Sequence, residues 1–89
     1  MEMLKVSSKS NPGMVAGAIA GVIRTNGSAE LQAIGGGAVN VTVKAIAIAS
    51  SFLAEEGITI SFLPSFTDIK ASEELELTAI SFKIDSKKE

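Results

Sequence analysis

The chain has 89 residues, of which 46% are hydrophobic, and a formal net charge of -2, with no cysteine and no histidine. This length predicts one domain over residues 1–89, and the missing residue types exclude disulfides and metal sites built from thiolates or imidazoles. Four basic side chains face two acidic ones in residues 1–44, and four face eight in residues 45–89. The overall charge therefore argues against a generic nucleic-acid coat but leaves room for a local basic site.

Hydrophobic periodicity and turn residues predict four strands and two helices in the order βαβαββ. The six elements are expected at residues 1–7, 12–26, 30–34, 38–54, 58–63 and 75–85, followed by a frayed tail at 86–89. Two successive βαβ units place both helices on one face of a mixed sheet. The expected fold class is therefore α/β (α+β), a two-layer sandwich with two helices on one face of a four-stranded sheet.

Capping and turn residues set the ends of these elements. Asn11 followed by Pro12 is a helix-start signal, because the Asn side chain can accept from free amides and proline needs no donor at that position. Gly27 supplies a left-handed residue that ends the first helix. Pro64 either ends the third strand or marks it as an edge strand, and the polar segment SFTDIKASEE is expected to connect it to the last strand.

The predicted first helix has an apolar side and a glycine side. The apolar side is expected to face the sheet; it consists of Val15, Ile19, Val22 and Ile23. Roughly opposite lie Gly17 and Gly21, which continue a series begun by Gly13. Each interior glycine costs about 1 kcal/mol relative to alanine, so this ridge indicates close approach by a neighbouring helix, a second subunit or a nucleic-acid backbone.

The predicted second helix carries two apolar stripes. The stripes are Val39, Val43, Ile46, Ala49 and Leu53, and Val41, Ala45, Ile48 and Phe52. A monomer easily buries only one of them, so the other is expected to meet an identical subunit in a homodimer or a larger even-numbered oligomer. The alternatives are that the second stripe packs on the first helix alone, or on both the helix and a partner.

The triple glycine at residues 35–37 does not complete a phosphate-binding motif. A GxGxxG fingerprint beginning at Gly35 needs glycine at position 40, where Asn40 stands, and no lysine follows at P-loop spacing. Free amides at a helix N-terminus could still hold an anion. The plainer interpretation is a tight turn with close packing.

No motif predicts catalysis, a cofactor or a membrane span. Without histidine or cysteine, a serine has no ordinary base for nucleophilic catalysis. A group of acidic residues is interpreted as a solvated surface; it consists of Asp68, Glu73, Glu74 and Glu76. Uninterrupted apolar runs fall short of about 20 residues, and the N-terminus lacks the order of a signal peptide. We expect a soluble, cytoplasmic protein that is not an enzyme and takes no small-molecule substrate.

Basic and amide side chains supply candidates for phosphate contacts. Lys9 lies among serines just before the predicted helix start, a cluster of donors suited to a phosphate; an ordinary exposed lysine beside an N-cap is the alternative. Lys5 is a further basic candidate, and Asn40 and Lys44 lie in the polar notch between the two stripes. The candidate nucleic-acid site comprises Ser8, Lys9, Ser10, Asn11, Arg24, Asn40 and Lys44.

Three segments carry a resemblance that covers nearly the whole chain: KVSSKSNPGMVAGAIAGVIR, ELQAIGGGAVN with VKAIAIA, and LPSFTDI. They closely resemble the bacterial stage V sporulation protein S family. The resemblance implies a small cytoplasmic regulatory protein linked to spore development, with a βαβαββ fold similar to the Alba group of nucleic-acid-binding proteins.

Two functions follow from this resemblance and from the residues. In Alba proteins the loop after the first strand carries lysines that face nucleic acid, and Lys9 matches that loop by position. Two other Alba features differ in this chain. Alba proteins have arginines flanking a glycine ahead of the second helix, where this chain has three glycines at residues 35–37, and their commonly basic hairpin corresponds here to SFTDIKASEE. The match at Lys9 favours a dimeric regulator that binds DNA or RNA. The missing positive charges favour the alternative, a protein-interaction module in the same process.

Overall fold

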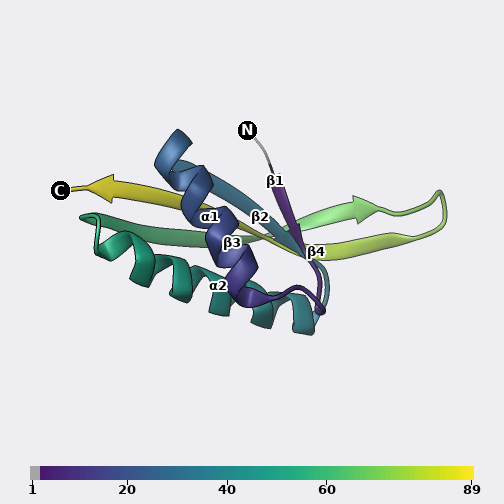
Figure 1. The fold of residues 1–89 in the computed structure, drawn as a ribbon. Coiled ribbons are helices and arrows are strands. Elements are labelled where there is room, and N and C mark those ends of the chain that lie inside the picture. The colour runs from purple at the N-terminus through teal and green to yellow at the C-terminus, as the bar shows by residue number, and fades with distance from the viewer. Residues whose placement is uncertain (1–2) are drawn as a thin grey trace.

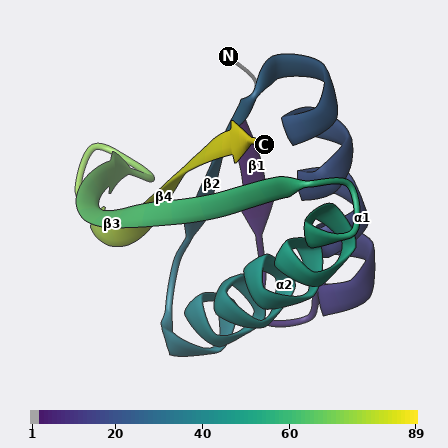
Figure 2. The same cartoon turned by 90° about the vertical axis from the view of Figure 1, so that its left-hand side faces the viewer.

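The structure, a computed structural model, describes residues 3–89 and has the expected order βαβαββ (Figure 1). The elements are β1 (Met3–Val6), α1 (Pro12–Asn26), β2 (Ser28–Ala33), α2 (Gly36–Ala54), β3 (Ile58–Lys70) and β4 (Glu76–Lys88). The strands form one mixed sheet in the order β1-β2-β4-β3, with β1 parallel to β2 and β4 antiparallel to both of its neighbours. Both helices lie on one face of this sheet (Figure 2), so the predicted two-layer sandwich is confirmed.

The predicted boundaries of α1 are confirmed by its caps. The Asn11 Oδ1 atom accepts a hydrogen bond of 3.1 Å from the Met14 amide, and Pro12 occupies the start of the helix. Gly27 adopts a left-handed φ of 81° and its amide donates to the Ile23 carbonyl at 2.8 Å. Met1 and Glu2, which were expected in the first strand, lie outside the described residues.

The hairpin formed by β3 and β4 is longer than the sequence predicts. β3 continues through Pro64 to Lys70, so the prediction that residues 65–74 form a connection is wrong for most of that segment. Pro64 instead marks an edge strand, where a missing donor breaks no ladder. The tail is not frayed, because β4 reaches Lys88 and the Glu89 amide donates to the Gly57 carbonyl at 2.9 Å.

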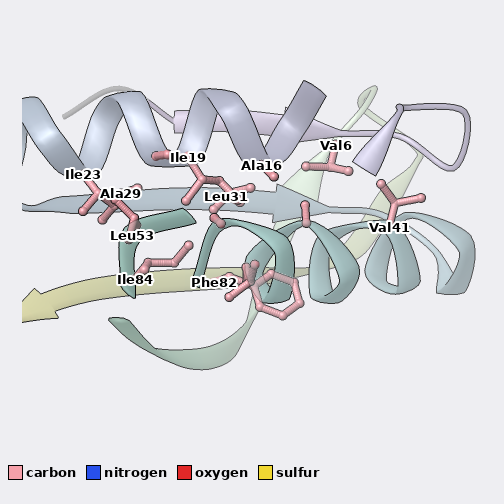
Figure 3. Packing of buried hydrophobic residues seen from close by; sticks show 14 of the residues in the cluster. Val6, Ala16, Ile19, Ile23, Ala29, Leu31, Val41, Leu53, Phe82 and Ile84 are labelled. Carbon is pink, nitrogen blue, oxygen red and sulfur yellow. The ribbon is translucent and has the colours of Figure 1, made fainter. Parts of the chain in front are cut away.

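The core lies between the helices and the central strands β2 and β4. On α1, Ile19 and Ile23 are buried as predicted, with Val15 half-buried beside them. They pack against the inward side chains of β2 and β4, among them Leu31 and Ile84, both 0% exposed (Figure 3). Burial of these side chains, at about 1.5–3 kcal/mol each, is the main force that fixes the helices on the sheet.

The two stripes predicted on α2 do not correspond to its buried face. The buried residues are Ala38, Val41, Thr42, Ala45, Ile46, Ala49 and Leu53, which come from both stripes and the gap between them. Thr42 fits this face because its hydroxyl donates to the Ala38 carbonyl at 2.8 Å. The large apolar side chains left exposed on α2 are Val43 and Phe52, one from each predicted stripe.

α2 also has the length and hydropathy of a membrane-spanning helix, with 19 residues and a mean hydropathy of 1.5. In this fold its buried side chains belong to the same core cluster as those of α1 and the sheet. The core helix of a soluble protein meets the same criteria.

Candidate nucleic-acid interface

The loop between β1 and α1 is held by its own polar side chains. The Ser7 amide donates to the Ser10 hydroxyl at 3.0 Å, and the Lys9 amide donates to the Ser7 hydroxyl at 3.1 Å. Asn11 Oδ1 is used as the helix cap. The side-chain oxygens of two predicted phosphate ligands, Ser10 and Asn11, therefore shape the loop together with that of Ser7. Ser8 and Lys9 are exposed on its surface.

α2 begins against this loop. A Cβ atom added to Gly37 would lie 2.8 Å from the Ser8 Cβ, closer than real side chains approach, so any side chain at this position would force the loop or the helix to shift. Gly35, the N-cap residue, has a φ of 90° and no side chain that could cap the helix. The first amides of any helix have no acceptor within the helix, and at the start of α2 no side-chain cap supplies one.

The two helices thus start at one corner of the molecule, which we call the helix-start corner and define as residues 7–11 and 35–37 (Figure 1). Each helix N-terminus carries a partial positive charge of about half a unit. Neither helix has an acidic residue in its first turn to neutralise that charge. Together with Lys9, this arrangement can hold an anion such as a phosphate.

Asn40 and Lys44 extend the helix-start corner along α2. They follow Gly37 by three and seven residues, a spacing that places all three on one side of a helix. Both side chains are exposed. The surface from Lys9 through Gly37 to Lys44 therefore collects two cations and one amide on adjacent elements.

The structure separates Arg24 from this group. Arg24 lies 13 residues beyond Asn11, about 20 Å along the helix axis. Its Nε atom lies 2.9 Å from Glu56 Oε1 and its Nη2 atom lies 2.6 Å from Glu56 Oε2. These hydrogen bonds lower the pKa of Glu56 and raise the pKa of Arg24. Arg24 therefore joins the end of α1 to the turn after α2.

Two other predicted features lie away from the helix-start corner. Lys5 is paired with Gln32 in the β1–β2 ladder and lies on the sheet face without helices. The glycine ridge of α1 is exposed, and a Cβ added to Gly17 or Gly21 would have no atom within 4 Å. Within residues 3–89, no neighbouring helix explains these glycines, which leaves a subunit or a nucleic acid as the remaining interpretations.

The β3–β4 hairpin carries negative charge. Its tip contains Glu73 and Glu74, and beside the tip Glu76 is paired with Lys70, the last residue of β3. The hairpin extends past the end of the body where α1 and α2 begin (Figure 1). No group of three acidic residues in the described part of the chain is arranged to hold a metal ion.

Comparison with protein families identifies one family that covers nearly the whole chain. The family model described as Stage V sporulation protein S (SpoVS) matches residues 2–87. The chain belongs to this family. The match includes the helix-start corner, both helices and all of the hairpin except Lys88, so the features described above lie within the SpoVS domain. Membership of the SpoVS family implies a role in sporulation.

The sequence identified most of the helix-start corner and missed one part of it. Lys9, Ser8 and Asn11 were candidates because of their place before a helix start. Gly37 was assigned to a tight turn with close packing before the second helix, and the structure places it inside α2. The triple glycine did not indicate that Ser8 is the residue that Gly37 approaches.

Proposed function

We propose that this SpoVS-family protein is a cytoplasmic, non-enzymatic regulator of spore development that binds the phosphates of DNA or RNA as a dimer. Its contact surface is the helix-start corner together with Asn40 and Lys44. The role in sporulation comes from the family, and nucleic-acid binding is the additional step.

One observation carries this proposal: the contact between Ser8 and Gly37, which brings the starts of both helices beside Lys9. Backbone amides, hydroxyl groups and lysines are the groups that proteins use to position phosphates. The chain has no Trp or Tyr, so stacking on such rings is not available. Binding is therefore expected to depend on charge and to discriminate weakly between sequences.

The test is fluorescence anisotropy of labelled duplex DNA, single-stranded DNA and RNA with the purified full-length chain. A site that neutralises two or three phosphates should lose about ten- to fortyfold in affinity between roughly 50 and 200 mM salt. Absence of binding at roughly 50 mM salt with about 100 μM protein, the weak limit of non-specific binding, would overturn the proposal.

A protein-interaction module in the same process is the second candidate. The observation that favours it is the acidic tip of the hairpin, because negative charge at that end opposes an approaching polyanion. The exposed glycine ridge of α1 offers a smooth surface for a partner. Capture of a sporulation protein by the full-length chain, lost in a Gly17→Gln variant, would support this function if nucleic acid does not bind.

A further inference from the structure

A groove lies between strand β1 and the first half of helix α1. We call it the β1–α1 groove; its apolar lining consists of Leu4, Val6, Met14, Val15 and Ala18. Its volume is about 350 Å³, which is within the range of sites that hold small ligands. Met14 is 77% exposed, so a large apolar side chain of this groove stands open to solvent in the single chain.

One side of the groove is a free strand edge. The sheet order β1-β2-β4-β3 makes β1 an edge strand, which pairs with β2 along all of Met3–Val6. No strand of the described chain lies on its other side. Alternate residues of a strand direct their backbone N–H and C=O groups to opposite sides, so about half of these groups on β1 face the open edge. An extended segment is the kind of partner that satisfies them.

The helix side of β1 determines which side chains such a segment needs. Leu4 and Val6 face the helices and are paired with Leu31 and Ala33, both of which are 0% exposed. Val6 is buried, and Leu4 is half-buried against the core. A strand added beside β1 would direct every second side chain to this same side of the sheet, into the groove below Met14. Alternate residues of the segment are therefore expected to be apolar.

The charge of the edge strand indicates the other residues of the segment. The polar residues that line the groove are Lys5, Ser10 and Asn11, and none of its lining residues is acidic. Lys5 is exposed on the sheet face without helices. Opposite charges on neighbouring strands stabilise a sheet and like charges destabilise it. A second β1 would bring another lysine into the same four residues, so the charge disfavours pairing with a copy and favours a segment with carboxylates.

We propose that the β1–α1 groove binds an extended segment of a partner protein in which apolar and acidic residues alternate. The segment adds to β1 as a further strand of the sheet, its apolar side chains enter the groove, and its carboxylates lie beside Lys5. In this mode of recognition, main-chain hydrogen bonds supply affinity, and pockets for alternate side chains supply specificity. The inference does not depend on nucleic-acid binding, and it gives the second candidate function a site and a class of partner.

The test uses four fluorescein-labelled peptides of about eight residues, in which glutamate alternates with valine, isoleucine, leucine or phenylalanine. Anisotropy with the full-length chain should saturate for at least one of them, and amide NMR shifts should be confined to β1, its neighbours and residues 14–18. Replacing the glutamates by lysines should weaken binding about tenfold or more at roughly 50 mM salt. Methylating alternate backbone amides of the peptide should weaken binding about tenfold in one of the two registers. No saturation at roughly 1 mM protein, or shifts elsewhere in the fold, would overturn the inference.

Ala18→Arg and Thr25→Arg form a matched pair, because both residues are exposed on α1 and only Ala18 lines the groove. Both variants should keep the circular dichroism spectrum of the wild type. Ala18→Arg should weaken peptide binding about tenfold although it adds a positive charge, because its side chain occupies apolar space in the groove. Thr25→Arg should not weaken it. Equal affinities for the two variants would contradict the inference. A chain that binds nucleic acid and no peptide loses this inference alone, and a chain that binds the peptide and no nucleic acid loses only the nucleic-acid proposal.

Discussion

Ser8 of the β1–α1 loop lies against Gly37 of α2 so closely that a Cβ atom on Gly37 would be 2.8 Å from the Ser8 Cβ. This contact joins two helix starts that are separated by more than 20 residues in the chain. It explains one glycine of the triple by packing. It is also the basis of the proposed phosphate site.

Gly37→Ala is expected to destabilise the fold by about 1–3 kcal/mol, because the added methyl group forces the loop or the helix to move. Gly36→Ala is the matched control, since a Cβ at that position meets nothing within 4 Å. Alanine there should be neutral or stabilising by up to about 1 kcal/mol. Urea unfolding of both variants makes the comparison, and equal stabilities would contradict the close contact.

Gly17→Ala and Gly21→Ala should each stabilise α1 by about 0.5–1 kcal/mol, because alanine has the higher helix propensity and both sites are open in the single chain. The midpoint of urea unfolding measures this gain. If activity in a sporulation assay falls while stability rises, the ridge contacts a partner. A loss of stability in either variant would show that the ridge is packed in the free protein.

The ion pair between Arg24 and Glu56 should make a small contribution to stability that depends on pH. The pKa of Glu56 is lower in the folded state than its ordinary value of 4.5, so the folded protein holds the charged form more strongly. The contribution is therefore present above the unfolded pKa and is lost as the pH falls through the folded one. Glu56→Gln should lower the melting temperature at pH 7, and the difference should shrink as the pH falls below 4.5 and through the lowered pKa of Glu56.

The acidic hairpin should weaken nucleic-acid binding at low salt. The double variant Glu73→Gln and Glu74→Gln is expected to raise affinity about threefold at roughly 50 mM salt and to have little effect at 200 mM, because salt screens exposed charges. Glu55→Gln with Glu89→Gln removes the same charge from the opposite end of the molecule. Equal gains from both double variants would show that only net charge matters.

Local signals predicted the fold well. Asn11, Pro12 and Gly27 set the ends of α1 because capping depends on neighbours in the chain. The length of the hairpin was not predictable in this way, since Pro64 and the polar residues after it indicate a break. Its continuation depends on cross-strand pairs such as the hydroxyl groups of Thr67 and Ser81, which lie 2.6 Å apart and come from distant segments.

The candidate site was predictable only in part, for the same reason. Lys9 and Asn11 were identified from their own neighbourhood. Arg24 looked equally available as a phosphate ligand, but its partner Glu56 lies 32 residues away and no local pattern reveals that pair. The exposed flank of α2 was also misassigned, because a helix with apolar residues on most of its sides does not show which arc the sheet will cover.

The most direct test of nucleic-acid binding at the helix-start corner compares Lys9→Gln with Lys87→Gln by fluorescence anisotropy over a range of salt concentrations. Both lysines are exposed, but Lys87 lies near the end of β4, at the opposite end of the molecule. We predict that Lys9→Gln weakens binding and reduces the slope of log affinity against log salt concentration by about 1 for each Lys9 side chain that contacts a phosphate. Lys87→Gln should match the wild type. Equal slopes for both variants and the wild type would contradict the proposal.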